Sequence, residues 1–129
     1  MPQNDLKDRT KSFALGAIRL VEELPRSRSA NVIGYQLLRA STSVAANYRS
    51  VCRARSRRDF IAKMGIVEEE ADEAQFWLEL VTDSGLLDAA RVLQLREEAS
   101  QLVAIAVSSI RTARGARASI PHSAFHIPH

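Results

Sequence analysis

The amino-acid sequence predicts an all-α protein, an antiparallel up-down-up-down bundle of four helices. Helix breakers are scarce, with 5 glycines and 4 prolines among 129 residues, and such a composition favours long helices. Aromatic residues make up only 5% of the chain, and Val, Ile and Thr do not gather in alternating runs between turn residues, so strand signals are nearly absent. Apolar residues recur instead at intervals of three and four in four segments joined by short turns, which is the pattern of an up-down bundle.

The length of the chain and its single cysteine set the broad class of protein. A chain of 129 residues is long enough for one hydrophobic core and short for two, so we expect a single domain. Cys52 cannot form an internal disulfide, and the first ten residues lack a basic-then-apolar signal pattern. No apolar run reaches the roughly 20 residues that a membrane helix needs. These features predict a soluble, cytoplasmic protein with no membrane partner.

The first two predicted helices are separated by a proline. Residues 5–23 carry their apolar side chains on one face, and Pro25 ends this helix because proline has no N–H to donate to the helical ladder. The second helix is expected over residues 31–53, with either Ser27 or Ser29 as its N-cap.

The third and fourth helices are marked by a capping pattern and a turn. Ser56 followed three residues later by Asp59 resembles a capping box, and it predicts a helix over residues 57–82. The turn at Gly85 then leads into a last helix over residues 88–113.

The chain therefore divides into a four-helix bundle at residues 1–114 and a flexible C-terminal tail at residues 115–129. The tail contains two prolines and no helical periodicity, which is why no further element is expected there.

A second apolar face on the third helix predicts self-association. At 100° per residue, Ile66, Phe76 and Leu80 lie opposite the stripe of this helix that faces the core. One helix cannot bury two opposed apolar faces inside one small bundle. Ile66, Phe76 and Leu80 are therefore the predicted subunit interface of a homo-oligomer.

Charge is strongly segregated along the chain, although the net charge is only +3. Residues 39–63 contain seven basic side chains and one acid, whereas residues 64–83 contain seven acids and no base. If the second and third helices form a hairpin, a basic helix faces an acidic one. We therefore predict an interhelical ion pair of Arg39 with Glu70 and Glu73.

The corner between the second and third helices is the best candidate for a functional site. Five of the ten residues from 49 to 58 are arginine and none is lysine. The guanidinium fork binds phosphate or carboxylate in a bidentate way that an ammonium group cannot. Two structural alternatives remain open: arginines at a helix end satisfy carbonyls and the helix dipole, or they pair with carboxylates of a neighbouring subunit. The predicted nucleic-acid-binding residues are Arg49, Arg53, Arg55, Arg57 and Arg58.

No catalytic residue, metal site or cofactor is predicted. Di-metal centres in four-helix bundles need Glu-x-x-His pairs on facing helices, and His122, His126 and His129 all lie in the tail. The acidic cluster around Glu69 is therefore interpreted as a solvated or ion-paired face. Phosphate-binding loops, dinucleotide fingerprints, zinc-protease motifs and nucleophile elbows are also absent from the sequence. We expect a protein that is not an enzyme.

Short motifs within residues 24–80 carry a resemblance to a known family. They are LPRS at residues 24–27, QLLR at 36–39, ANYR at 46–49 and EADE at 70–73. In this order they resemble the small bacterial four-helix bundle family associated with intervening sequences of 23S rRNA genes. The resemblance implies a cytosolic bundle that assembles as a ring-like homo-oligomer, a pentamer, with a poorly defined molecular role. Accessory proteins of diversity-generating retroelements look similar in fold and oligomer, and they bind nucleic acid and a reverse transcriptase.

The sequence thus predicts a non-enzymatic homo-oligomer that binds the phosphate backbone of RNA or DNA through an arginine-rich surface. The alternative is a protein-protein adaptor or scaffold with no nucleic-acid binding. A carboxylate-metal enzyme is the least favoured reading.

Overall fold

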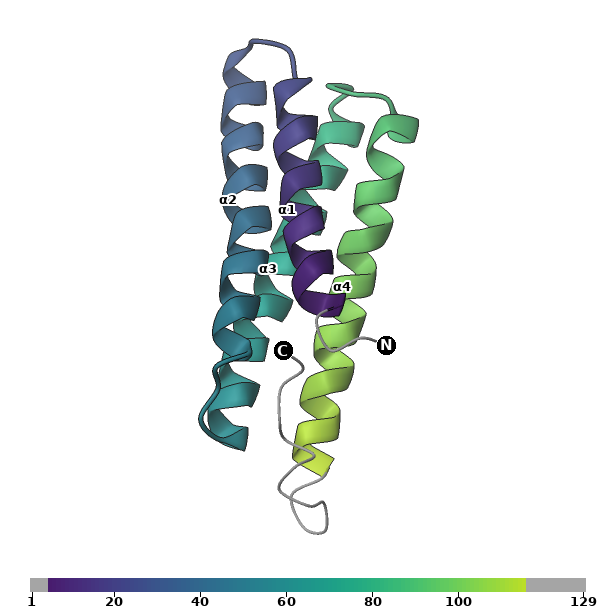
Figure 1. Cartoon of the computed structure of the whole chain (residues 1–129). Helices are drawn as coiled ribbons and strands as arrows, with labels where there is room; N and C mark the ends of the chain where they lie inside the picture. Colours follow the sequence, from purple (N-terminus) through teal and green to yellow (C-terminus); the bar gives the residue numbers. More distant parts are fainter. Residues whose placement is uncertain (1–4, 116–129) are drawn as a thin grey trace.

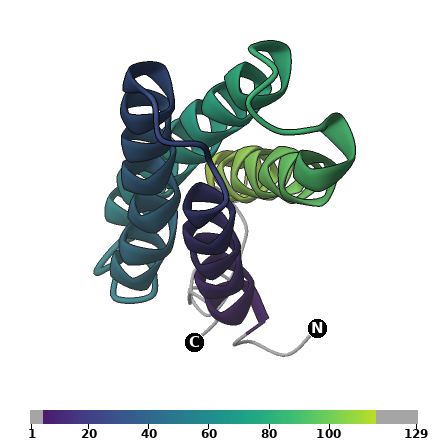
Figure 2. The ribbon, with the colours of Figure 1, turned by 90° about the horizontal axis from the view of Figure 1, so that it is seen from above.

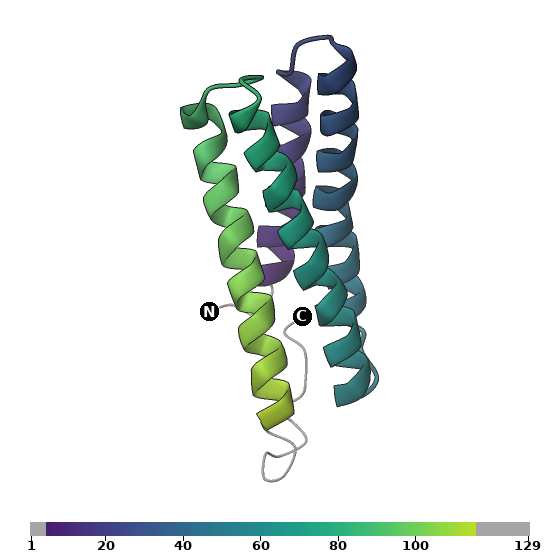
Figure 3. The same ribbon diagram turned by 180° about the vertical axis from the view of Figure 1, so that it is seen from behind.

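The computed structural model describes residues 5–115, which form four α-helices and contain no β-strand (Figure 1). The helices are α1 (Asp5–Glu22), α2 (Arg28–Val51), α3 (Arg57–Asp83) and α4 (Ala89–Gly115). The all-α class predicted from the sequence is confirmed. The α1–α2 and α3–α4 connections lie at one end of the molecule and the α2–α3 connection at the other, so successive helices run in opposite directions (Figures 1 and 3). Nearly all of the predicted tail, residues 116–129, lies outside the described residues.

The observed helix ends differ from the predicted ends by up to three residues. Helix α2 begins earlier than predicted, at Arg28, because Ser27 is the N-cap and its hydroxyl accepts the backbone N–H of Ala30 (3.1 Å). It also ends earlier, at Val51, where the chain turns toward α3. Helix α4 extends two residues beyond its predicted end, to Gly115. The other ends lie within one residue of the prediction, which is the usual uncertainty at a fraying terminus.

Small side chains fill much of the core and let the helices approach closely. Ala40 of α2, Ala71 and Ala74 of α3 and Ala99 of α4 are fully buried. The large residues packed among them include Tyr48, Phe13, Leu37, Leu78 and Leu102. Burial of this apolar surface is the main source of stability for a chain of this length.

The packing of the four helices is unequal. Helix α3 packs extensively along α2 on one side and α4 on the other, while α1 packs mainly on α2 and touches α4 much less. Seen along the helices (Figure 2), the end of α4 nearest the viewer leans away from α1. Of the four pairs of helices that pack along each other, α1 and α4 are therefore the least closely packed.

The register of the α1–α2 hairpin depends on a glycine. A Cβ placed at Gly34 would lie 3.0 Å from Cδ1 of Leu24 and 3.4 Å from Cγ1 of Val21. Gly34 thus lets the end of α1 lie directly against the first turns of α2.

No helix within residues 5–115 is both long enough and apolar enough to cross a membrane.

Candidate nucleic-acid interface

The basic corner, defined as residues 49–58, joins the end of α2 to the start of α3. Buried side chains at the end of α2 anchor it to the core. Tyr48 and Val51 are essentially inaccessible, and Cys52 is buried. Burial, together with the neighbouring Cys52 thiol, raises the pKa of the Tyr48 hydroxyl above its usual range, so this phenol stays neutral. The corner is therefore a fixed part of the fold and not an independent loop.

The start of α3 is held by reciprocal side-chain and backbone hydrogen bonds. The Ser56 hydroxyl accepts the backbone N–H of Asp59 (3.0 Å), and the Asp59 carboxylate accepts the backbone N–H of Arg55 (3.1 Å). The same carboxylate oxygen lies 3.1 Å from Nζ of Lys63. The capping pattern read from the sequence is thus present, with Asp59 reaching one residue further back than a standard capping box.

The pKa of the Asp59 carboxyl lies below its usual range, chiefly because it accepts the Arg55 backbone N–H and also because Lys63 is its ion-pair partner. Asp59 is therefore ionised at neutral pH, and it is a negative charge set inside a positive surface.

The arginines of the basic corner are accessible to a ligand. Arg49, Arg53, Arg55 and Arg58 are exposed, whereas Arg57 is half-buried. Within residues 5–115, none of the four exposed guanidinium groups takes part in an ion pair. The charge of these four arginines is therefore not neutralised by an ion pair with an acid of residues 5–115, although Asp59 lies near Arg55.

These guanidinium groups are also not needed to close the end of α2. The carbonyls of Tyr48, Ser50 and Val51 accept the backbone N–H groups of Cys52 (3.1 Å), Arg53 (3.0 Å) and Ala54 (3.0 Å). These are three of the four carbonyls that the end of α2 leaves without a helical partner and that capping arginines would otherwise serve. Helix capping is therefore not needed to explain why the corner contains these arginines.

A shallow, open hollow lies on the corner, with a volume of about 660 Å³ and lining residues from both helices and the turn. The lining residues are Ser50, Arg53, Arg55, Asp59 and Lys63. This volume is large enough to hold a group much larger than a water molecule or a single ion. Lys63 and Ser50 were not predicted as members of this site. The signal for Lys63 in the sequence is its position one helical turn after Asp59.

The predicted ion-pair residues meet on the outer surface of the α2–α3 hairpin. Arg39 lies 3.3 Å from Glu70 and pairs with Glu73, while the Gln36 side chain accepts the Arg39 Nε–H (3.0 Å). The indole N–H of Trp77 donates to Glu73 (3.0 Å). This network bridges α2 and α3 on the surface of the hairpin.

The predicted interface residues project from α3 to differing degrees. Ile66 is 41% exposed and Phe76 is 49% exposed, whereas Leu80 is only half-buried. Phe76 packs edge-on against the ring of Trp77, with centroids 5.1 Å apart. Ile66 and Phe76 of α3 thus remain accessible in the single subunit, with the exposed acids Glu69 and Asp72 between them in the sequence.

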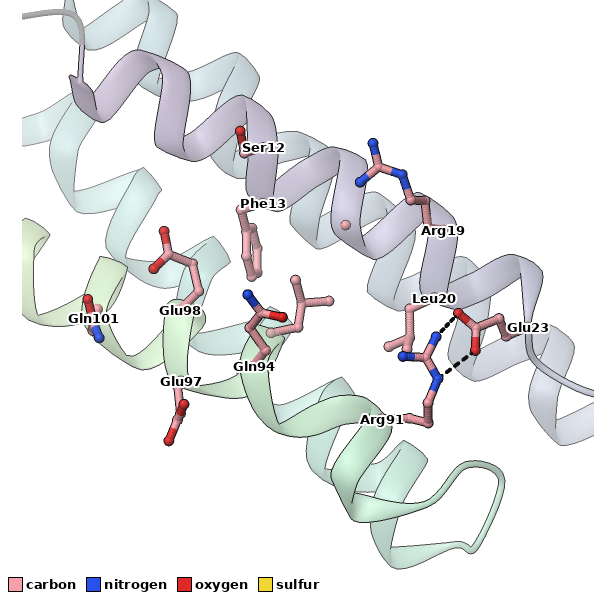
Figure 4. A pocket seen from close by; sticks show the side chains of 12 residues that line it. Ser12, Phe13, Arg19, Leu20, Glu23, Arg91, Gln94, Glu97, Glu98 and Gln101 are labelled. Atoms are coloured by element: carbon pink, nitrogen blue, oxygen red, sulfur yellow. Dashed lines mark hydrogen bonds and ion pairs between the residues drawn. The ribbon is translucent and has the colours of Figure 1, made fainter.

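A second hollow, not predicted from the sequence, lies along the α1–α4 seam and has a volume of about 640 Å³ (Figure 4). Phe13 and Leu20 of α1 and Leu95 of α4 contribute its apolar part. The groove is bracketed by two ion pairs between the helices, Arg91 with Glu23 at one end and Arg9 with Glu98 (2.7 Å) toward the other. Of its charged lining residues, Glu23, Arg91 and Glu98 are therefore already paired, whereas Arg19 and Glu97 form no ion pair within residues 5–115.

Residues 5–115 contain no group of three or more His, Cys, Asp and Glu side chains arranged to hold a metal ion. His122, His126 and His129 lie outside the described residues.

Comparison with known proteins gives a consistent family assignment. Residues 3–108 match the family described as 23S rRNA-intervening sequence protein. Among solved structures, the chain is similar to a protein of unknown function from the S23 ribosomal protein family of Bacteroides thetaiotaomicron VPI-5482. The two are 31% identical with a TM-score of 0.76, over 82% of this chain and 98% of that chain. No curated protein matches this sequence.

Proposed function

The chain belongs to the 23S rRNA-intervening sequence protein family, and from this premise we propose that it is a non-enzymatic, cytoplasmic protein that binds the phosphate backbone of RNA or DNA. Binding is through the basic corner, repeated around a ring-like homo-oligomer of five subunits. The subunit number comes from the family resemblance, and the contacts come from the corner's own side chains.

One observation carries the proposal. Arg49, Arg53, Arg55 and Arg58 are exposed, they form no ion pair within residues 5–115, and the end of α2 is closed by backbone N–H groups instead. Four exposed guanidinium groups at one helical corner, none in an ion pair with a described residue, attract a polyanion and suit bidentate contacts with phosphate oxygens.

The chemistry of the corner favours backbone contacts over base contacts. The aromatic residues closest in sequence to the corner, Tyr48 and Phe60, are buried and half-buried respectively, so neither offers a free ring face on which a base could stack. A site limited to phosphate contacts positions nucleic acid without reading its sequence. Duplexes should bind more tightly than single strands of equal length, because their phosphate charge is denser.

Salt dependence provides the test of this function. Binding of a labelled 20-base-pair RNA duplex, measured by fluorescence anisotropy, should weaken as salt rises, since each phosphate contact contributes a slope of about −0.9 in log affinity against log salt. The double variant Arg53→Gln/Arg58→Gln should weaken binding about tenfold or more at low salt and make that slope shallower.

The matched control removes the same charge elsewhere. Arg19 and Arg26 are also exposed, but they lie on α1 and in the α1–α2 turn, away from the basic corner. Arg19→Gln/Arg26→Gln should leave affinity nearly unchanged. Equal losses in both double variants would show a nonspecific effect of net charge, and no binding at low salt would leave the adaptor function in place of this one.

A further inference from the structure

The hollow on the basic corner gathers hydrogen-bond donors from three successive parts of the chain. Ser50 belongs to the last turn of α2, Arg53 and Arg55 belong to the connection, and Lys63 lies in the second turn of α3. Hydroxyl, guanidinium and ammonium groups all donate hydrogen bonds. Donors of three kinds around one space suit a compact acceptor that presents several oxygens.

These donors are available to a ligand. Arg53 and Arg55 are exposed, and neither forms an ion pair within residues 5–115. Nζ of Lys63 lies 3.1 Å from an Asp59 carboxylate oxygen, and the Lys63 side chain is 33% exposed. Because an ammonium group has three N–H donors, this pair uses only part of its capacity. Lys63 can therefore donate to a ligand in the hollow without leaving Asp59.

The charge of the hollow favours an anion with more than one negative charge. The lining contains three cations, Arg53, Arg55 and Lys63, and one carboxylate, Asp59, so its net charge is two positive units. A phosphodiester of the backbone carries one negative charge. A terminal phosphate, which is a phosphomonoester, carries about −1.5 to −2 at pH 7. The terminal group therefore matches the charge of the hollow more closely than a backbone phosphate does.

The shape of a terminal phosphate fits these donors as well. In a phosphodiester, two of the four oxygens are bonded to sugars, and only two are free to accept charge-assisted hydrogen bonds. In a phosphomonoester, three oxygens are free and a single link carries the strand. Three free oxygens can meet two guanidinium forks and the Lys63 ammonium group at once. Because the hollow is shallow and open, the single link can leave it toward solvent.

We propose that the hollow of the basic corner is a binding site for the terminal phosphate of a nucleic-acid strand, held as its dianion by Arg53, Arg55 and Lys63. This inference rests on the proposed function and names the part of the nucleic acid that the hollow takes. Arg49 and Arg58 are exposed on the same corner but do not line the hollow, and they contact the backbone that follows. The protein therefore binds strand ends more tightly than internal backbone.

Short RNA strands that differ only at one end test this site. A 12-nucleotide single strand has few backbone contacts, so they do not hide the contribution of its end. Internally labelled strands with a 5′-phosphate, with a 3′-phosphate, or with hydroxyl groups at both ends are compared by fluorescence anisotropy. At least one phosphorylated strand should bind about fivefold or more tightly than the hydroxyl-ended strand. A difference between the two phosphorylated strands identifies the end that the site accepts.

A strand of equal charge controls for simple electrostatic attraction. A hydroxyl-ended strand that is two nucleotides longer carries about the same total charge as the phosphorylated strand. It should bind like the shorter hydroxyl-ended strand. If it binds as tightly as both phosphorylated strands, the extra affinity comes from total charge alone, and the proposal is overturned.

Arginines inside and outside the hollow provide matched variants. Arg53→Gln/Arg55→Gln should abolish the preference for the phosphorylated end, and it keeps the Arg55 backbone N–H that donates to Asp59. Arg49→Gln/Arg58→Gln removes equal charge from the corner outside the hollow, so it should weaken binding of all strands and keep the preference. Loss of the preference in both variants would make it a general effect of charge and would contradict the site. If circular dichroism shows that Arg53→Gln/Arg55→Gln does not fold, Arg53→Lys/Arg55→Lys serves instead, because it keeps the charge and should reduce the preference by removing the guanidinium forks.

The pH dependence of the preference tests for the dianion. The second pKa of a phosphomonoester is about 6, so the terminal phosphate loses charge as the pH falls from about 7.5 to about 5. Asp59, the carboxylate of the hollow, stays ionised over this range because its pKa is lowered, and guanidinium and ammonium groups do not titrate there. The preference for the phosphorylated end should therefore shrink at the lower pH. A preference that is the same at both pH values would contradict binding of the dianion.

The outcomes for the hollow and for the proposed function can be separated. Binding of all strands with equal affinity would overturn the terminal-phosphate site and leave binding of the backbone by the corner in place. Binding of none of the strands, and of no duplex, at low salt would overturn both.

Discussion

Asp59 shows how one side chain serves the fold and opposes the proposed ligand. Its carboxylate holds the first turn of α3 through the Arg55 N–H and pairs with Lys63, yet it also lies in the hollow lined by Arg53 and Arg55. Removing its charge should therefore change stability and phosphate affinity in opposite directions.

Asp59→Asn provides this prediction at neutral pH. The folded pKa of Asp59 is lowered, so its stabilising effect is fully present above the ordinary pKa of 3.8 and is lost as the pH falls through the lower folded value. The variant should unfold at a slightly lower temperature than wild type at pH 7, and the difference should disappear as the pH falls through the lowered folded pKa of Asp59. Its affinity for duplex RNA should rise a few-fold at low salt. Weaker binding would mean that Asp59 orders the corner more than it repels phosphate.

Ser41 has an unsatisfied buried hydroxyl that could be recognised only in the structure. Its side chain is fully buried in α2 and its hydroxyl has no hydrogen-bond partner among the described residues. Because an unsatisfied buried hydroxyl is unfavourable and alanine is the better helix former, Ser41→Ala should stabilise the subunit by about 1 kcal/mol. Urea unfolding at fixed protein concentration measures this change.

Thr10→Val is the matched control for Ser41→Ala. Thr10 is equally buried, but its hydroxyl donates to the carbonyl of Lys7 (3.1 Å). Removing this satisfied hydroxyl should give no gain and a loss of up to about 1 kcal/mol. An equal stabilisation at both positions would trace the effect to general hydrophobicity.

At the scale of the helices, the sequence predicted the features that depend on the local pattern of residues, which are the number of helices and their approximate ends. The scarcity of breakers, the position of Pro25 and the Ser56 capping pattern gave four helices with ends close to those observed. The sequence did not decide between Ser27 and Ser29 as the N-cap of α2. Serine is a good cap at either position, and the choice depends on where the chain turns after α1.

Features that depend on how helices lean against each other could not be predicted. The periodicity of α1 and α4 does not say that they diverge, so the groove between them and its bracketing pairs, Arg9 with Glu98 and Arg91 with Glu23, appeared only in the structure. Likewise, the arginines of the basic corner could be counted in the sequence, but which of them are exposed and which ion pairs they form could be read only from the structure.

The α1–α4 seam leads to a prediction about local opening. Helix α1 has little packing on α4, and ion pairs at an exposed seam are weakened by salt and by acid. Arg91 lowers the pKa of Glu23, so this pair is intact at neutral pH and is lost as the pH falls below the ordinary glutamate value. Arg9→Gln/Arg91→Gln should therefore speed amide hydrogen exchange in α1 a few-fold at pH 7.

The same measurement on other parts of the chain supplies the comparison. Exchange at the centre of α2 and α3 should not change in Arg9→Gln/Arg91→Gln, since these helices pack extensively on each other. Arg19→Gln/Arg26→Gln, which removes equal charge without breaking an interhelical pair, should leave α1 as in wild type. Uniform acceleration throughout the chain would show global destabilisation instead of opening at the seam.

At the scale of the whole molecule, the basic corner and the predicted interface on α3 lie in different places. The corner lies at the end of the molecule formed by the α2–α3 connection (Figure 1), whereas Ile66, Phe76 and Leu80 belong to α3, which runs along the side of the bundle. A homo-oligomer assembled through the sides of the helices, as proposed above, would therefore leave the corners free and gather them at one rim. Rotational symmetry would then add the potentials of the copies.

This arrangement predicts that assembly changes the salt dependence of binding and not only its strength. Phe76→Asp, which should disrupt the predicted α3 interface and give a monomer, keeps Arg49, Arg53, Arg55 and Arg58. Four phosphate contacts correspond to a slope of about −3.6 in log affinity against log salt as an upper limit for one corner. A rim that places more than one corner on the same duplex must release more counterions, so the wild-type assembly should show a distinctly steeper slope. Salt titration of both proteins with one duplex long enough to span the rim measures the difference. Equal slopes would mean that each corner binds alone, and the ring would then raise affinity only by presenting several independent sites.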